Sequence, residues 1–392
     1  MNAPLAMARS ATAPVGQIKS DGQGRLALLA AGGTGGHVFP ALALAEILLA
    51  RGFRVDLVTD RRGSAFHDLD PRMAVHRLFA GTTTGRGPLR KAAGAARLLL
   101  GVGQAWLRLM RLKPAVVVGF GGYPSLPALI AASRLGQPTV IHDQNAVLGR
   151  ANRLLAPRAS AIATSFASVA GLRPRDTGRI VCTGNPVRAA IARLAGSPYS
   201  APQLDGPLDV LILGGSQGAH VFSAVVPEAI RRLPQHLQAR LRIAQQVRPE
   251  DLAAVEAAYD GVSANITLRA FFTDVPQRLA AAHLVICRAG GSTVAELTTA
   301  GRPAILVPFP GALDQDQAAN AQAMDEAGGG WLMPQSAFTP DALASRLQRL
   351  LTMPDLLIRA AAAAGALGRP DAAAALADLV AATARPVGGG RP

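Results

Sequence analysis

Short apolar runs alternate with amphipathic stretches along most of the chain. The runs are rich in Val, Ile, Leu and Ala, as expected for strands that are buried on both faces. A regular alternation of strand and helix is typical of a parallel sheet covered by helices, so the sequence predicts an α/β fold. The expected strands are residues 25–31, 53–59, 75–79, 115–119, 138–142, 161–164, 179–182, 209–213, 240–245, 266–270, 283–286 and 303–307.

The pattern pauses once and restarts, which indicates two domains in the 392 residues. Residues 196–207 are rich in Gly, Ser and Pro and are the expected linker between a first domain at 25–195 and a second at 208–365. Each domain opens with a strand, a glycine-rich loop and a helix. The two loops are Gly-Gly-Thr-Gly-Gly at 32–36 and Gly-Gly-Ser-Gln-Gly at 214–218. Their separation is too long for a solenoid repeat and suggests two Rossmann-like domains whose loops face one cleft.

The stretch 287–296, Cys-Arg-Ala-Gly-Gly-Ser-Thr-Val-Ala-Glu, joins an expected buried strand to a helix that starts near Ser292. Its glycines allow a ligand to approach the backbone closely, and the helix start offers free N–H groups and the positive end of the helix dipole, which suit a phosphate. Glu296, one turn into the helix, could accept hydrogen bonds from ribose hydroxyls. An ordinary strand-to-helix corner with a Ser- or Thr-to-Glu capping box explains the same residues.

A dinucleotide-binding fingerprint is an alternative reading of the first glycine loop. A G-x-G-x-x-G pattern that starts at Gly33 needs its last glycine at the position of Val38, and it fails there. Asp60 does lie at a tolerable distance for a ribose-binding acid. The incomplete pattern disfavours NAD.

Two polar clusters are further candidate ligand contacts. His-Asp-Gln-Asn at 142–145 follows an expected strand, and ligands of α/β sheets bind at the carboxyl ends of the strands. Gln317 and Asn320 share one face of an expected helix start, where their amides could bind sugar hydroxyls. A polar helix N-terminus is the simpler explanation of the second pair.

Charge is distributed unevenly. The net charge is +15, and between Asp70 and Asp143 the chain has ten basic residues and no acidic one. Such an interval attracts nucleic acid or anionic lipid. The expected helix 89–113 combines basic residues with Trp106 and many leucines, which favours a membrane surface, whereas the scarcity of aromatic residues for base stacking disfavours nucleic acid. A core helix with solvated arginines is the alternative, above all for its C-terminal half.

Several other classes are disfavoured. The two cysteines and seven histidines show no disulfide or metal-ligand spacing, so we expect a reducing cytoplasm and no metal. Residues 1–24 show no secretory signal and are expected to form a disordered tail, and 386–392 a flexible end. The uncharged windows 26–45 and 115–133 are interrupted by Gly-Gly and Pro turns, which suits strand, loop and helix and not a membrane span.

Six motifs follow one another in a fixed order. They are Gly-Gly-Thr-Gly-Gly-His-Val-Phe-Pro at 32–40, Gly-Gly-Tyr-Pro-Ser at 121–125, His-Asp-Gln-Asn at 142–145, Gly-Asn-Pro-Val-Arg at 184–188, Gly-Gly-Ser-Gln-Gly-Ala at 214–219, and the stretch 288–296. Together they resemble the MurG family, the N-acetylglucosaminyltransferases of peptidoglycan synthesis. Each motif alone is weak, but six in order are specific, and the resemblance covers about residues 25–380.

This resemblance implies a GT-B fold, in which two Rossmann-like parallel-sheet domains face each other across a cleft and a C-terminal helix, here about 370–384, returns to the first domain. It implies inverting transfer of GlcNAc from UDP-GlcNAc to the C4 hydroxyl of the muramoyl sugar of lipid I, which gives lipid II without a cofactor. It also implies a peripheral enzyme on the cytoplasmic side of the bacterial inner membrane, with anionic lipid and, as a possible partner, the cell-wall synthesis machinery.

The resemblance further assigns site residues. Those expected to approach the donor sugar or the acceptor diphosphate are Thr34, Gly35, Gly36 and Asn145. Those expected to hold UDP are Arg188 and Ser216 on the diphosphate, Thr273 on uracil through its backbone, and Gly291, Ser292, Thr293, Val294, Ala295 and Glu296 on ribose and phosphate. Gln317 is expected to contact the GlcNAc hydroxyls, with Asn320 close by.

Inverting transfer needs a base for the acceptor hydroxyl and stabilisation of the departing UDP. His37 is the first candidate base, because imidazole changes its charge near neutral pH. The alternative is that His37 only binds the acceptor or the loop backbone. Asp143 is the second candidate.

The chain departs from the family pattern at several positions. Asp143 stands where Glu is usual, His220 and Ser223 where Arg and Asn are usual, and Gly291 where a small residue such as Ala is common. Competing functions are another UDP-sugar GT-B enzyme such as a UDP-GlcNAc 2-epimerase, a catalytically idle UDP-sugar-binding protein at the membrane, and, third, an NAD oxidoreductase.

Overall fold

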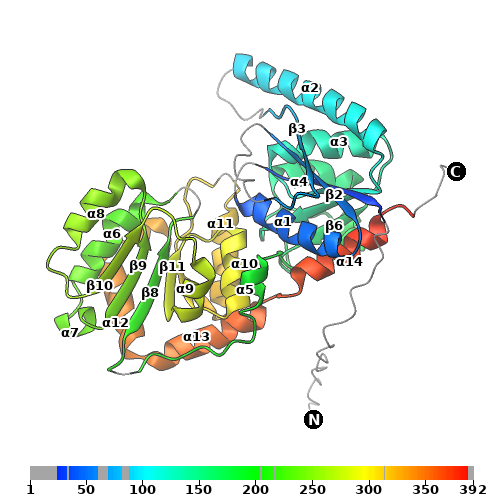
Figure 1. Ribbon diagram of the computed structural model, residues 1–392. Helices are drawn as coiled ribbons and strands as arrows, with labels where there is room; N and C mark the ends of the chain where they lie inside the picture. Colours follow the sequence, from blue (N-terminus) through cyan, green and yellow to red (C-terminus); the bar gives the residue numbers. More distant parts are fainter. Residues whose placement is uncertain are drawn as a thin grey trace, which may run out of the picture.

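The computed structural model describes residues 24–32, 35–60, 69–81, 88–203, 205–215, 218–312 and 314–386. Within these residues the chain forms two α/β domains, each built on one parallel sheet, that lie next to each other (Figure 1). The predicted α/β class and the two Rossmann-like parallel-sheet domains are confirmed.

The first domain contains a seven-stranded sheet of order β3-β2-β1-β4-β5-β6-β7. The order reverses between β1 and β4, which pair in register from Ala27 with Val116 to Ala30 with Gly119. The crevice beyond the carboxyl ends of two such strands is where open α/β sheets bind ligands. The strands are β1 (Leu26–Ala30), β2 (Arg54–Thr59), β3 (Ala74–Arg77), β4 (Val116–Gly119), β5 (Thr139–Asp143), β6 (Ala161–Thr164) and β7 (Ile180–Cys182).

Successive residues of β1 point to opposite faces of the sheet, and both faces are covered by helices. Leu29 packs in the core that includes α1 and α14, whereas Leu28 packs in the core that includes α2 and α3. Both uncharged windows fold as strand, turn and helix where they are described. The helices of this domain are α1 (Gly35–Ala50), α2 (Pro88–Leu112), α3 (Leu126–Arg134) and α4 (Arg150–Leu155), with α14 (Ala372–Thr383) from the end of the chain.

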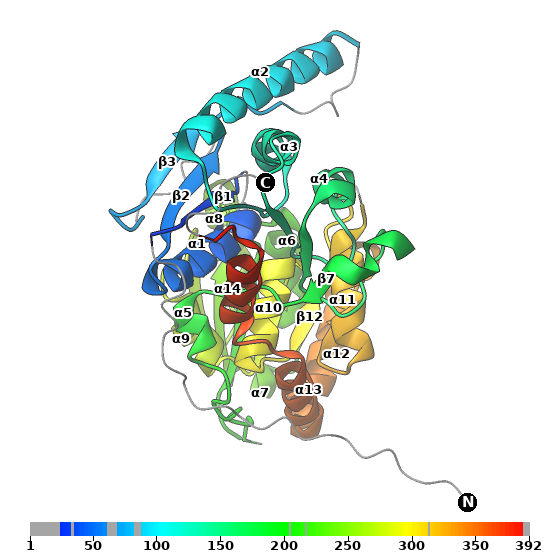
Figure 2. The same cartoon turned by 90° about the vertical axis from the view of Figure 1, so that its right-hand side faces the viewer.

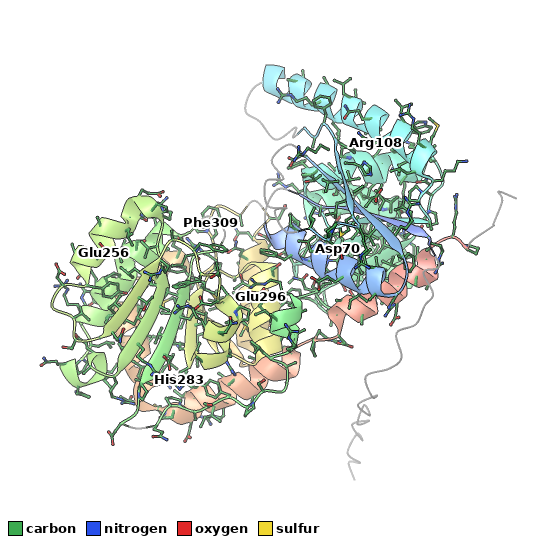
Figure 3. The ribbon with its side chains drawn as sticks, in the orientation of Figure 1. Asp70, Arg108, Glu256, His283, Glu296 and Phe309 are labelled. Carbon is green, nitrogen blue, oxygen red and sulfur yellow. The ribbon has the colours of Figure 1, made fainter. Side chains whose placement is uncertain are left out.

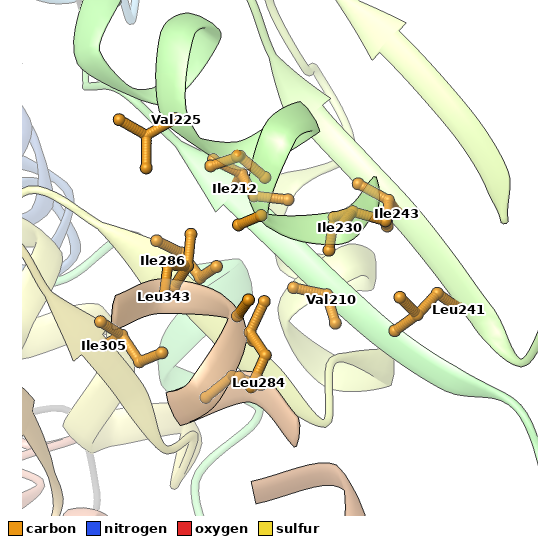
Figure 4. Close-up of a cluster of buried hydrophobic side chains, with 14 of the residues drawn as sticks. Val210, Ile212, Val225, Ile230, Leu241, Ile243, Leu284, Ile286, Ile305 and Leu343 are labelled. Atoms are coloured by element: carbon orange, nitrogen blue, oxygen red, sulfur yellow. The ribbon is translucent and has the colours of Figure 1, made fainter. Parts of the chain in front are cut away.

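The second domain contains a six-stranded sheet of order β10-β9-β8-β11-β12-β13, which reverses between β8 and β11. Its core is built from Val, Ile and Leu of the central strands and of α6 and α12 (Figure 4). The sequence analysis missed the short edge strand β13, whose Gly-Trp-Leu sequence carries little strand signal. The strands are β8 (Leu208–Leu213), β9 (Leu241–Gln246), β10 (Asn265–Arg269), β11 (Leu284–Cys287), β12 (Ala304–Leu306) and β13 (Gly330–Leu332). The helices are α5 (Ala189–Ala192), α6 (His220–Arg231), α7 (Gln235–Gln238), α8 (Leu252–Ala258), α9 (Val275–Ala281), α10 (Gly291–Ala300), α11 (Asp316–Glu326), α12 (Pro340–Thr352) and α13 (Pro354–Leu367).

The Ala-rich tail from residue 340 has a composition typical of helix and forms three helices, α12, α13 and α14. Proline at position 354 starts α13, and a second break precedes α14. α14 lies against α1 of the first domain (Figure 2). The Arg51 guanidinium pairs with the Asp378 carboxylate at 2.9 Å, which ties the end of the chain to α1.

Candidate functional site

The helix starts of α1 and α10 meet at the junction between the domains. Each helix follows a strand at the reversal point of its sheet. Ser292 Oγ donates a hydrogen bond to the Gly36 carbonyl at 3.1 Å. A Cβ on Gly291 would lie only 2.2 Å from the Gln144 carbonyl oxygen, so glycine permits this close approach of the two domains. The structure therefore brings Gly35, Gly36, Gly291 and Ser292 together.

Asn320 joins the two domains as a fully buried side chain. Its Oδ1 accepts from the Ala146 N–H at 2.8 Å, and its Nδ2 donates to Asn145 Oδ1 at 2.9 Å and to the Ala289 carbonyl at 3.0 Å. Both N–H groups of the Asn320 amide therefore donate hydrogen bonds to other groups of the protein. In this structure Asn145 and Asn320 bind each other across the junction.

An ion pair on the outer edge of the same junction escaped the sequence analysis. Asp314, just before α11, accepts from Arg150 Nε at 3.1 Å and lies 3.7 Å from Arg153 Nη2 on α4. Only the tertiary structure pairs these residues, because they belong to different domains. Gln317, at the start of α11, accepts a hydrogen bond from the Phe309 N–H through Oε1 at 3.0 Å. Among the described contacts, the NH2 group of Gln317 donates no hydrogen bond.

Glu296 of α10 binds Arg188 at the start of α5. The Arg188 Nε and Nη2 atoms both lie 2.9 Å from Glu296 Oε1. Burial raises the pKa of the Glu296 carboxyl, and Arg188 opposes that rise. The Arg188 guanidinium also lies over the Phe39 ring of α1, 5.3 Å from its centroid. Figure 3 shows Glu296 on the side of the second domain that faces the first.

His37 lies in the first turn of α1, half-buried, with its ring against Gly121 and Gly122. A Cβ on Gly122 would lie 3.4 Å from His37 Nε2, and the backbone of Gly122 has φ of 71°, which favours glycine. These glycines make room for the imidazole beside the loop that follows β4. His37 Nδ1 lies 3.0 Å from Gln144 Oε1.

Gln144 connects His37 to the interior. Its Nε2 lies 3.0 Å from the Phe120 carbonyl oxygen and 3.0 Å from His142 Nδ1. His142 is fully buried, and its Nε2 lies 3.0 Å from the Gly184 carbonyl oxygen. Gln144 stood inside a motif in the sequence, but no sequence signal marked it as a contact of His37.

Asp143 is buried and organises the loop between β5 and α4. Its Oδ1 accepts from the Asn145 N–H at 3.1 Å, and its Oδ2 accepts from the Gly149 N–H at 2.8 Å and from Asn152 Nδ2 at 3.0 Å. Burial raises the pKa of the Asp143 carboxyl, and these hydrogen bonds oppose the rise. Both oxygens of Asp143 therefore already accept hydrogen bonds from this loop.

Three of the remaining predicted residues lie on α10. Thr293 lies half-buried in the first turn of α10, whereas Val294 and Ala295 line a cavity of about 190 Å³ that also touches Phe166 of the first domain. Thr273 is exposed in the loop before α9. Thr34 and Ser216 lie outside the described residues.

Two residues that depart from the family pattern, His220 and Ser223, lie on α6. His220, at the start of α6, lies 3.1 Å from the Asp251 carboxylate through Nδ1. Ser223, one turn later, is buried. No group of three or more His, Cys, Asp or Glu residues suited to a metal occurs among the described residues.

Acid is expected to destabilise the protein through His142. Burial lowers the pKa of His142 from 6.5 to about 4, because the charged ring loses its hydration. As the pH falls, His142 therefore binds a proton in the unfolded chain at a higher pH than in the folded protein. The stabilisation is fully present above the pKa that His142 has in the unfolded chain, and it is lost as the pH falls toward the pKa in the folded protein. Between neutral pH and about pH 5 the expected loss is about 2 kcal/mol, measured as the free energy of unfolding in urea.

Two variants separate this contribution from that of other groups. His142→Gln should be less stable at neutral pH but should lack this part of the acid dependence. His236→Gln changes an exposed histidine on α7 and should keep it. Equal acid dependence in the His142→Gln variant and the wild type would contradict the assignment.

Comparison with known proteins extends these observations. Residues 27–164 match the glycosyltransferase family 28 N-terminal domain and residues 209–376 match the glycosyltransferase family 28 C-terminal domain. Two similar relatives are described as UDP-N-acetylglucosamine–N-acetylmuramyl-(pentapeptide) pyrophosphoryl-undecaprenol N-acetylglucosamine transferases. The protein of Paramagnetospirillum magneticum is 56% identical over 91% of this chain and 96% of its own length, and that of Rhodospirillum centenum is 57% identical over 90% and 93%.

Solved structures agree with the fold. MurG of Acinetobacter baumannii superimposes with a TM-score of 0.74 at 31% identity, over 91% of this chain and 99% of that one. A putative UDP-N-acetylglucosamine 2-epimerase of Listeria monocytogenes, at 16% identity and a TM-score of 0.64 over 90% and 94%, shares the fold alone.

Proposed function

The chain belongs to glycosyltransferase family 28, and from this membership we infer that it transfers GlcNAc from UDP-GlcNAc to lipid I and forms lipid II. The fold is of the GT-B type. The observation that carries the function is the high identity to GlcNAc transferases over nearly the whole of both chains. Incubation with UDP-GlcNAc and a lipid I analogue, followed by analysis of the product, tests it. Formation of UDP-N-acetylmannosamine without any acceptor would instead identify an epimerase.

The second domain supplies the donor site in this proposal. The diphosphate binds at the start of α10, where backbone N–H groups and the helix dipole favour an anion. Glu296 accepts hydrogen bonds from the ribose, and Arg188 moves from Glu296 toward the diphosphate when the donor enters. Thr273 contacts uracil and Gln317 contacts the GlcNAc hydroxyls. The short distance between Glu296 and Arg188 supports this assignment, because it places one anionic and one cationic side chain together beside α10.

The first domain supplies the acceptor site. Gly35, Gly36 and Asn145 face the lipid-linked diphosphate and sugar. His37 Nε2 takes the proton of the C4 hydroxyl as that oxygen attacks the anomeric carbon and the bond to UDP breaks, which inverts the configuration. Negative charge on the departing UDP is stabilised by Arg188 and the start of α10. The position of His37 at the meeting point of α1 and α10 supports this role.

Helix α2 is the proposed contact with the membrane. It projects from the first domain (Figure 1), and one side packs in the core through Ala105 and Leu109. Its other side exposes Leu99, Leu100 and Leu107 at 72%, 62% and 56%, with arginines beside them. Leucines that enter the headgroup boundary and arginines that meet anionic lipid suit a peripheral enzyme with a membrane-anchored acceptor. In this proposal the core interpretation applies to one face of the helix and the membrane interpretation to the other.

Among the described residues, no single helix has both the length and the apolar character to cross a bilayer. One pair of helices, Pro340–Thr352 and Pro354–Thr383, meets these requirements only jointly and is bent by 93°.

Replacing Leu99, Leu100 and Leu107 together by Ser is expected to weaken binding to anionic liposomes at least about 10-fold, because even partial burial of leucine side chains contributes more than about 1.4 kcal/mol in total. Cosedimentation with liposomes of phosphatidylglycerol measures this. Leu154→Ser, which changes an exposed leucine on α4, is the matched control and should bind like the wild type. Unchanged binding of the triple variant would remove α2 as the membrane contact.

A further inference from the structure

Each hydrogen bond that connects His37 through Gln144 to the interior has a defined donor and acceptor. A backbone carbonyl group determines which atom donates and which accepts. The Phe120 carbonyl oxygen, 3.0 Å from Gln144, can only accept. The amide of Gln144 must therefore turn its NH2 group toward Phe120, since its oxygen there would face another oxygen. Gln144 Oε1 then points at His37 and can only accept as well.

His142 reinforces this orientation from the other side. Its Nε2 lies 3.0 Å from the Gly184 carbonyl, which also can only accept, so Nε2 carries the proton. Its Nδ1 is then an acceptor for the second N–H of Gln144, at 3.0 Å. His142 is buried and neutral near neutral pH, so that this arrangement is the stable one.

These constraints determine the tautomer of His37. Because Gln144 Oε1 accepts, the His37 Nδ1 atom must donate across the 3.0 Å contact. A neutral His37 then has its free lone pair on Nε2, the atom beside Gly122, where the absence of a side chain leaves room. A general base needs a free lone pair directed at the hydroxyl that it deprotonates.

We propose that Gln144, held by Phe120 and His142, is a positioning residue that fixes His37 as the Nδ1–H tautomer and presents Nε2 to the acceptor hydroxyl. This inference rests on the proposed role of His37 as the base. Gln144 does not touch the substrate in this scheme. It acts through His37 alone, much as a carboxylate orients a catalytic histidine in a hydrolase triad.

The charged groups around His37 do not provide this control. Asp143 and His142 are the titratable groups that face His37 from the β5 side. The Asp143 carboxylate already accepts hydrogen bonds from N–H groups of its own loop. On the α10 side Glu296 and Arg188 bind each other, with Arg188 over the Phe39 ring. Among the described contacts, Gln144 is the one side chain that hydrogen-bonds the His37 ring.

Nitrogen NMR of the full-length protein labelled at histidine tests the tautomer without reference to activity. Above the histidine titration range, wild-type His37 should carry its proton on Nδ1. In Gln144→Met, which keeps the length of the side chain and removes its hydrogen bonds, the His37 signals should shift toward a mixture that includes Nε2–H. Gln348→Met, at an exposed position on α12, should leave them unchanged.

Kinetics then test the consequence. Gln144→Met should lower kcat by at least about 10-fold, because loss of the correct tautomer of a catalytic histidine costs up to about 10⁴-fold, with little change in the KM for UDP-GlcNAc. In a His37→Ala background the same replacement should have almost no further effect on kcat, since the two residues act as one unit.

Each outcome is decisive. A wild-type His37 protonated on Nε2, or a tautomer that does not change in Gln144→Met, would overturn the inference. A comparable loss of kcat with and without His37 would mean that Gln144 only supports the fold. If Gln144→Met does not fold, Gln144→Asn withdraws the amide by one methylene and should give the same tautomer mixture. A Gln144-dependent tautomer together with an active His37→Ala variant would refute the proposed base and leave the hydrogen-bond assignment standing.

Discussion

Replacing His37 by alanine is expected to lower kcat for GlcNAc transfer by about 100-fold or more, because general-base catalysis typically contributes about 10²- to 10⁴-fold. His37 lies at the start of α1 with Nδ1 bound to Gln144, so the variant removes the proposed base and leaves the loops around it in place. The KM for UDP-GlcNAc should change little, since the donor is held by the second domain. Steady-state kinetics with a lipid I analogue measure both constants.

His236→Ala, at an exposed position on α7, is the matched control and should retain full activity. A His37→Ala enzyme within a few-fold of the wild type would remove His37 as the base. Asp143 is a weaker alternative because both of its oxygens accept hydrogen bonds from the loop that it organises.

Replacing Glu296 by alanine is expected to raise the KM for UDP-GlcNAc by about 10- to 100-fold. Hydrogen bonds to a charged group contribute about 1.5–3 kcal/mol, and each 1.4 kcal/mol changes an equilibrium constant tenfold. The variant loses the acceptor for the ribose hydroxyls and also leaves Arg188 without its partner at 2.9 Å. Titration calorimetry with UDP measures the donor site separately from catalysis.

Two further variants help to identify the cause of that change in KM. Glu296→Gln keeps an oxygen that can accept from the ribose and loses only the ion pair with Arg188, so it should bind UDP better than Glu296→Ala. Glu326→Ala, at the exposed end of α11, should bind like the wild type. Wild-type affinity in Glu296→Ala would exclude Glu296 from the donor site.

The local pattern of the chain was sufficient for most of the architecture. Strands of a parallel sheet are buried on both faces, so β1, β4 and β11 are continuous apolar runs that stand out in the sequence. Glycine-rich loops and helix starts at the ends of such strands identify ligand-binding edges. The misses were elements with weak local signals, namely β13 and the breaks within the C-terminal Ala-rich segment.

The contacts that define the site were not predictable in this way. Gln144 and His37 are 107 residues apart, Arg188 and Glu296 are 108 apart, and Asn145 and Asn320 are 175 apart. Each pair forms because particular strand ends face each other, either across one sheet or across the junction of two. No spacing rule within a helix or strand relates such residues.

The sequence by itself determined that this protein has two Rossmann-like sheets with a glycine-rich loop before a helix in each, because burial periodicity and glycine loops are local properties. Tertiary structure alone decided that Asn145 binds Asn320, that Arg188 binds Glu296, and that Gln144 binds His37. The physical reason is that a hydrogen bond needs two groups within about 3 Å, and for residues so far apart along the chain only the packing of whole domains sets that distance.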